Sequence, residues 1–143
     1  GVPVGAFAVT DRVAEASLKP GDHGTTYGGN PLALAAVRAS LGLMEEKGIV
    51  AHVASLTPYL EKVLDGFVED FDFVKERRGM GFMQGLVLDE KILAGDVVAQ
   101  ALKFGLVILS AGGNVLRFLP PLVAEKRDID AMHEILRDVL RSF

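Results

Sequence analysis

The sequence contains no cysteine among its 143 residues. Disulfide bonds, thiolate catalysis and cysteine-based metal sites are therefore excluded. Its 15 lysines and arginines face 19 aspartates and glutamates, for a formal net charge of −4. Binding to nucleic acid or to an anionic membrane surface requires a basic patch that this chain lacks. No uncharged apolar run approaches the roughly 18 residues of a membrane helix. We expect a cytoplasmic protein without nucleic-acid or membrane partners.

What is present is an ordinary globular composition, with 50% hydrophobic and 24% charged residues. A chain of this length can bury one sizeable core. It opens on the apolar segment GVPVGAFAVT, in which Val2 to Thr10 is predicted to form a buried strand. The segment has no positively charged start of the kind that signal peptides have. A sequence that opens within a strand is expected to be part of a longer protein.

Helices dominate the first half of the chain. Asp11 is expected to cap a short helix that ends at Leu18, and Pro20 and Gly21 mark a turn. Asn30 is a good N-cap and the proline after it suits a first helical position, so a helix is predicted from residue 31 to Gly48. A second helix is predicted over residues 49–67, with a kink or restart at Pro58.

The second half alternates strands with helices. Strands are predicted over residues 83–88, 106–110 and 114–122, and helices over 95–104 and 128–140. This alternation predicts an α/β fold, a small α+β sandwich with helices packed on one face of a small sheet. Met80 and Met83 are expected to fill its core.

The loop GDHGTTYGGNP, residues 21–31, crowds glycines and hydroxyl side chains ahead of a helix. Glycine lets a backbone approach a ligand closely, and hydroxyls with free helix N–H groups can hold a phosphate. The loop contains neither the G-x-G-x-x-G nor the G-K-[ST] phosphate motif. From the residues alone, a phosphate site and an ordinary glycine-rich connection both remain open.

Three segments in order resemble class III aminotransferases, which depend on pyridoxal 5'-phosphate. They are PGDHGTTYGGNPLALAA, RGMGFMQGLVL and LSAGGNVLRFLPPLV. The first is most similar to acetylornithine aminotransferases of arginine biosynthesis. The resemblance implies the C-terminal part of a fold-type I enzyme, with residues 1–48 as the tail of the large cofactor-binding domain and 49–143 as the small domain. The family's Schiff-base lysine would lie upstream, so the fragment alone should be inactive and contains no catalytic residue.

The resemblance also implies a homodimer in which one subunit completes its partner's active site. Thr26 falls where the family binds the cofactor phosphate of the partner, and Thr25 where it contacts the substrate. Arg117 falls where the family binds the substrate carboxylate. An arginine suits this role because its planar fork holds a carboxylate with two hydrogen bonds. From the residues alone, a structural ion pair remains the alternative for Arg117.

Two other functions stay open at this stage. One is another class III ω-aminotransferase that acts on ornithine, succinylornithine or 4-aminobutyrate. The other is a non-catalytic binding or dimerisation module. The remaining polar residues are expected to be structural: His23 makes a local hydrogen bond, His52 and His133 lie on the surface, and Arg77 serves folding. No spacing of histidines and carboxylates indicates a metal site.

Overall fold

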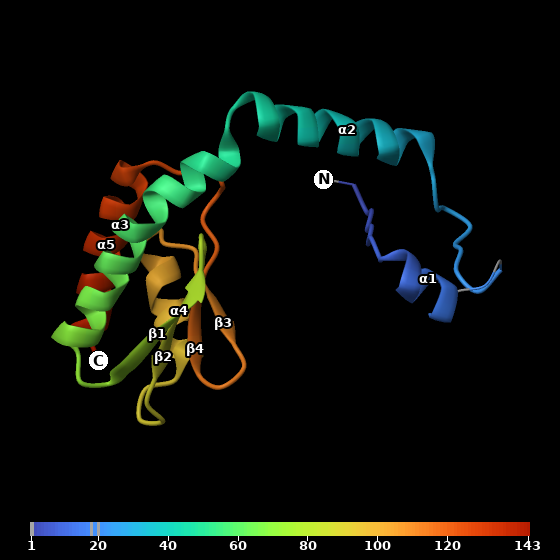
Figure 1. The fold of residues 1–143 in the computed structure, drawn as a ribbon. Helices are drawn as coiled ribbons and strands as arrows, with labels where there is room; N and C mark the ends of the chain where they lie inside the picture. Colours follow the sequence, from blue (N-terminus) through green and yellow to red (C-terminus); the bar gives the residue numbers. More distant parts are fainter. Residues whose placement is uncertain (1, 18, 20) are drawn as a thin grey trace. The chain divides into compact units, whose positions relative to one another are not determined.

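The computed structural model describes residues 2–17, 19 and 21–143, and the chain divides into two compact units, residues 1–47 and 48–143 (Figure 1). The predicted end of the first helix at Leu18 and the turn residue Pro20 lie outside the described residues. The assignment of residues 1–48 to a cofactor-binding domain stays a prediction.

The first unit contains two helices, α1 (Asp11–Ser17) and α2 (Pro31–Glu46). Helix α2 begins where the sequence predicts, because Oδ1 of Asn30 accepts hydrogen bonds from the backbone N–H groups of Leu32 (3.0 Å) and Ala33 (3.1 Å). It ends before Gly48, whose φ of 58° is in the left-handed region that glycine adopts readily. The capping residues therefore fix both ends of this helix.

The predicted strand at residues 2–10 is wrong. These residues have no regular secondary structure, and the side chains of Val4, Phe7 and Val9 are 49%, 62% and 45% exposed. A strand exists only where its backbone groups pair with a neighbour. Among the described residues of the first unit, no other strand offers that pairing. The apolar residues of this segment favour a strand, but a strand also needs a second strand to pair with, which the residue pattern cannot reveal.

The second unit is built from three helices and four strands. In chain order they are α3 (Ile49–Asp70), β1 (Val74–Met80), β2 (Met83–Leu88), α4 (Ala94–Lys103), β3 (Leu109–Ala111), β4 (Val115–Phe118) and α5 (Lys126–Leu140). The strands form one antiparallel sheet in the order β1-β2-β4-β3. Helices α3 and α4 pack on the sheet, and α5 packs on both of them (Figure 1).

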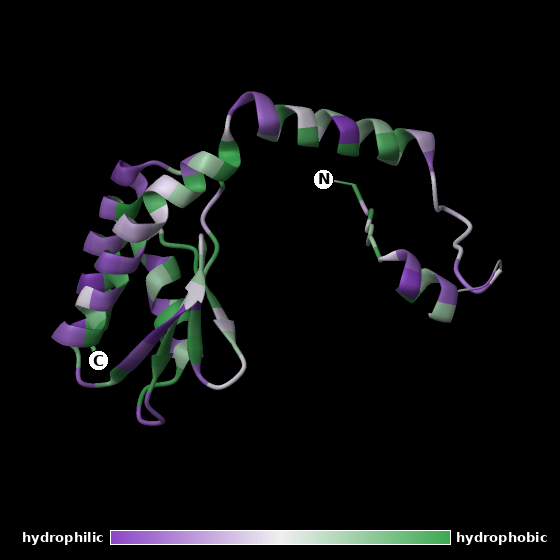
Figure 2. Ribbon diagram, in the orientation of Figure 1, coloured by the Kyte–Doolittle hydropathy of each residue, from purple (hydrophilic) through white to green (hydrophobic). Residues whose placement is uncertain are grey.

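The core lies between the helices and one face of the sheet, as Figure 2 shows by its hydrophobic residues. Leu86 of β2 is paired with Leu116 of β4, and both side chains are fully buried in this core. They pack there with Leu64 and Phe67 of α3. Helices on one face of a small sheet confirm the predicted α/β class. The other face of the sheet, which we call the open face, carries the alternate residues of each strand.

Three further features of the structure differ from what the sequence predicts. Helix α3 runs through Pro58 without interruption, so of the predicted kink or restart there, the restart is wrong. Strand β1 was not predicted, because its residues are charged and mostly exposed. Met80 and Met83 do not fill the core: they flank the β1–β2 turn and are 84% and 62% exposed. Their alternation places them on the open face rather than against the helices.

Candidate functional site

The candidate phosphate-binding residues Thr25 and Thr26 lie in a tight turn before α2. The turn closes where the N–H of Gly28 donates to the carbonyl of Thr25 at 3.1 Å, and Gly29 has a φ of 69°. Both threonines are exposed. A Cβ at Gly28 would lie only 3.1 Å from Oγ1 of Thr25, so a side chain there would crowd that hydroxyl.

The donor set of this turn fits a phosphate. Two adjacent hydroxyls and a glycine-rich backbone can donate several hydrogen bonds to an anion without steric hindrance. These donors suit the phosphate and substrate contacts that the resemblance implies for Thr26 and Thr25, which stay predictions. Nearby, the ring of His23 packs edge-on against Phe7 at 5.2 Å between centroids, so the structure gives His23 an aromatic contact.

Arg117 lies in the middle of β4, on the open face of the sheet. Its cross-strand partner on β2 is Gly85, and its partner on β3 is Leu109. Arg117 is half-buried, and its Nε is buried without a hydrogen-bond partner among the described residues. A buried polar atom of this kind needs an acceptor. No carboxylate of the described chain forms an ion pair with Arg117, so its guanidinium remains available to a carboxylate ligand.

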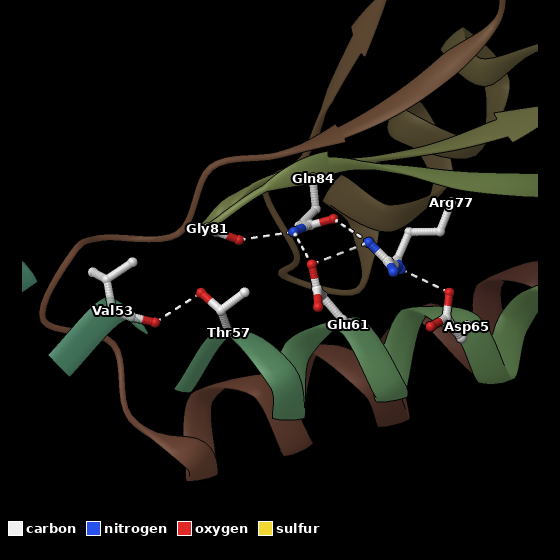
Figure 3. A network of polar contacts seen from close by, with 7 residues as sticks. All are labelled: Val53, Thr57, Glu61, Asp65, Arg77, Gly81 and Gln84. Atoms are coloured by element: carbon white, nitrogen blue, oxygen red, sulfur yellow. Dashed lines mark hydrogen bonds and ion pairs between the residues drawn. The ribbon is translucent and has the colours of Figure 1, made fainter. Parts of the chain in front are cut away.

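The opposite, helix-side face of the sheet carries a polar network that sequence reasoning only partly anticipated (Figure 3). Arg77 donates from Nε to Oδ1 of Asp65 at 2.7 Å and from Nη1 to Oε1 of Gln84 at 3.0 Å. Glu61 accepts from Arg77 at 3.3 Å. Gln84 is 1% exposed and donates to the carbonyl of Gly81 at 2.8 Å.

This network ties the β1–β2 hairpin to helix α3. The hydrogen bond to Asp65 is the main cause that raises the pKa of Arg77 above its ordinary value. Arg77 therefore stays charged and has the folding role expected for it. Gln84 was missed, because a single glutamine within an apolar strand carries no sequence signal for its partners.

The two helical histidines are not simple surface residues, which corrects the sequence expectation. Nε2 of His52 lies 2.8 Å from the carbonyl oxygen of Ala124, and the ring of His133 packs against Phe67 in a tilted arrangement, at 5.1 Å between centroids. Both rings are half-buried and serve packing. Among the described residues, no group of histidines and carboxylates can hold a metal ion. Nor does any helix of the described ranges have the length and apolar character to cross a membrane.

The family profile described as aminotransferase class-III matches residues 1–140. The chain belongs to this family. The acetylornithine aminotransferase of Methanocaldococcus jannaschii is 42% identical over 139 residues, which covers 97% of this chain and 34% of that protein. The chain thus spans about a third of the length of this curated relative.

Solved structures of the family share the fold. An ornithine δ-aminotransferase of Plasmodium falciparum has a TM-score of 0.82 and 29% identity, over 88% of this chain and 32% of that one. The ornithine aminotransferase of Toxoplasma gondii, described with partial occupancy of PLP at its active site, has a TM-score of 0.74 and 27% identity. That match covers 87% of this chain and 30% of the other. The chain therefore shares its fold with about a third of each of these aminotransferases.

Proposed function

We propose that this chain is the C-terminal portion of an acetylornithine aminotransferase, which transfers the δ-amino group of N-acetylornithine to 2-oxoglutarate and yields N-acetylglutamate semialdehyde and glutamate. The observation that carries the proposal is the 42% identity to the acetylornithine enzyme of Methanocaldococcus jannaschii over nearly the whole chain. Such a reaction belongs to arginine biosynthesis, and we place the protein in the cytoplasm.

In this proposal Arg117 holds the α-carboxylate of either substrate. The donor and 2-oxoglutarate both carry such a group, so one arginine serves both halves of the reaction. Arg117 lies on the open face, where its partner on β2 is Gly85 and no helix of the second unit packs. The absence of an ion pair between Arg117 and any carboxylate of the described residues supports the role, since no internal partner competes for its charge.

Pyridoxal phosphate, when bound, supplies the electron sink of transamination. Thr26 would donate its hydroxyl to the phosphate of that cofactor in the partner subunit of a homodimer, while Thr25 would contact the substrate. Their exposed hydroxyls support this arrangement. The lysine that binds the cofactor lies outside these 143 residues in this proposal, so the isolated chain should not transaminate.

The experiment is an assay of the full-length protein, loaded with pyridoxal phosphate, against N-acetylornithine, ornithine, succinylornithine and 4-aminobutyrate. We expect the highest kcat/KM with N-acetylornithine. Ornithine as the preferred donor would favour the alternative that the Plasmodium falciparum likeness supports. Activity with none of the four donors would favour a non-catalytic module. Sedimentation of the same protein tests the homodimer, which a strict monomer would contradict.

A further inference from the structure

Asn114 occupies an unusual backbone position at the start of β4, three residues before Arg117. Its φ of 59° makes it the one residue other than glycine with a positive φ among the described residues. Asparagine tolerates this left-handed conformation better than most residues do. The position lies in the turn between β3 and β4, so it sets the direction in which β4 leaves the turn.

The side chain of Asn114 joins three separate parts of the second unit. Its Nδ2 donates to the carbonyl oxygens of Asp89 at 2.7 Å and Ile92 at 2.9 Å. Its Oδ1 accepts from the N–H of Ala94 at 2.7 Å. The same Nδ2 is 3.4 Å from the carbonyl of Leu88, whose own N–H donates to the backbone carbonyl of Asn114 at 3.0 Å.

These bonds fasten β4 to the loop that follows β2. Helix α4 has no side-chain cap at its own N-cap residue, so the amide of Asn114 satisfies one of its free N–H groups instead. The donors and acceptors of a carboxamide match this set of two carbonyls and one N–H, and no other side-chain type does so without losing a bond. One residue therefore fixes the loop, the helix start and the strand start together.

No ion pair within the described residues holds the side chain of Arg117 in place. Gly85 opposite offers no side chain, and the buried Nε has no partner among the described residues. The direction of its guanidinium consequently follows the backbone of β4, a strand of only 4 residues. A small rotation of the strand at Asn114 would move the fork away from a bound carboxylate, and misplacement on this scale weakens bidentate binding.

We propose that Asn114 is a positioning residue for Arg117: through its amide it orients β4 and so sets the affinity of the site for carboxylate substrates. The inference rests on the proposed role of Arg117. In this proposal Asn114 itself contacts neither substrate nor cofactor and acts only through Arg117. Its effect should appear in carboxylate binding and depend on the arginine being present.

The test is a double-mutant cycle in the full-length holoenzyme, with glutarate as an unreactive C5 dicarboxylate and calorimetry as the readout. Asn114→Gly keeps the left-handed backbone but removes the amide, and Asn114→Asp keeps Oδ1 but removes the donor. We expect each variant to weaken glutarate binding about tenfold, the size of one displaced charged hydrogen bond. In an Arg117→Lys background, the same changes should weaken binding less than about twofold.

Tyr59→Phe provides the control, because it removes a hydrogen bond between α3 and α5 without touching β4. It should lower the melting temperature and leave glutarate binding unchanged. Unchanged binding in both Asn114 variants overturns the positioning role, as does an equal loss in both backgrounds. If Arg117→Lys itself leaves glutarate binding intact, the proposed carboxylate site fails, which is a different outcome. Melting curves identify folded variants, and loss of folding in Asn114→Gly, the conformationally permitted change, also overturns the proposal.

Discussion

Gly85 of β2 is paired across the sheet with Arg117 of β4, and its other neighbour in the same row is Arg78 of β1. A Cβ built on Gly85 would lie 2.8 Å from Cγ1 of Val115, closer than side-chain atoms pack. The position thus allows Val115 to lean over β2 beside the arginine. The glycine is required by a close approach rather than by a turn.

Gly85→Ala should therefore lower the free energy of unfolding by about 1–3 kcal/mol, the usual cost of overpacking. Because the displaced Val115 precedes Arg117 by two residues, glutarate binding should weaken as well. Gly66→Ala is the matched control: it lies in α3 with nothing within 4 Å of an added Cβ. It should stabilise the protein by about 0.5–1 kcal/mol. Urea unfolding measures both, and a stable Gly85→Ala variant would contradict the close contact.

Arg77 and Arg78 are adjacent in sequence but should differ sharply in their contribution to stability. Arg77 is 20% exposed in its side chain and serves Asp65 and the buried Gln84. Arg77→Gln should lower the free energy of unfolding by about 1–3 kcal/mol, because it leaves Oε1 of the buried Gln84 without its donor. The side chain of Arg78 is 57% exposed, and its one ion pair among the described residues is a long one, 3.8 Å from Nη1 to Oε1 of Glu76. Because exposed ion pairs contribute little, Arg78→Gln should change the free energy of unfolding by less than about 0.5 kcal/mol. Equal effects in urea unfolding would refute the network.

The cluster of Tyr59, Lys126 and Asp130 predicts a pH effect on stability. The hydrogen bond from Tyr59, and then that from Lys126, lowers the pKa of Asp130 below its ordinary value of 3.8. A lowered pKa in the folded state stabilises the protein above that ordinary value, and the stabilisation disappears as the pH falls through the lower folded pKa. Asp130→Asn should thus melt below the parent at pH 7 and converge with it as the pH falls below the folded pKa of Asp130. Tyr59→Phe should reduce the pH dependence. Parallel melting curves at all pH values would rule out the effect.

Local signals in the sequence predicted the helices well. Asn30 and Pro31 act through hydrogen bonds and a φ preference within one turn of helix, so their effect can be read without knowledge of the fold. The apolar run at residues 2–10 was misread, because a strand depends on a partner that no local pattern reveals. Met80 and Met83 were misplaced for a related reason: the hairpin turn puts both on the open face.

Only part of the candidate site could be predicted from the sequence. Arg117 and the Thr25–Thr26 turn were predicted as site residues from ordered motifs, and their roles stay predictions. The structure adds that Arg117 is paired with a glycine and has an Nε without a hydrogen-bond partner among the described residues. Gln84 and Asn114 were missed. Their partners lie 23 residues away at Glu61 and 20 residues away at Ala94, a separation at which one sequence gives no pairing information.

Thr26→Ala in the full-length protein should weaken cofactor retention by about 1–3 kcal/mol, the cost of one lost charged hydrogen bond. Thr25→Ala should instead raise the KM for the amino donor and leave cofactor retention unchanged. The two variants form a matched pair, because both residues are exposed in the same turn. Equilibrium dialysis of pyridoxal phosphate separates them. Equal retention in the parent and Thr26→Ala would exclude the phosphate role.

Arg117→Lys should damage the full-length enzyme far more than its conserved charge suggests. Lysine keeps the positive charge but loses the planar fork, so a carboxylate is held by one bond and the amino nitrogen is misaligned. The loss of one of two charged hydrogen bonds costs about 1.5–3 kcal/mol, or a ten- to hundredfold fall in kcat/KM.

In the proposed reaction both halves should suffer alike, since N-acetylornithine and 2-oxoglutarate would each present an α-carboxylate to the same arginine. Single-turnover kinetics measures each half separately. Arg78→Lys is the matched control, because Arg78 flanks Gly85 from the other side in the same row and is exposed. It should leave both rates within about twofold, which is the range of a surface charge substitution. Near-normal rates for Arg117→Lys with both substrates would show that Arg117 is a structural residue, because lysine cannot form the two-pronged contact with a carboxylate.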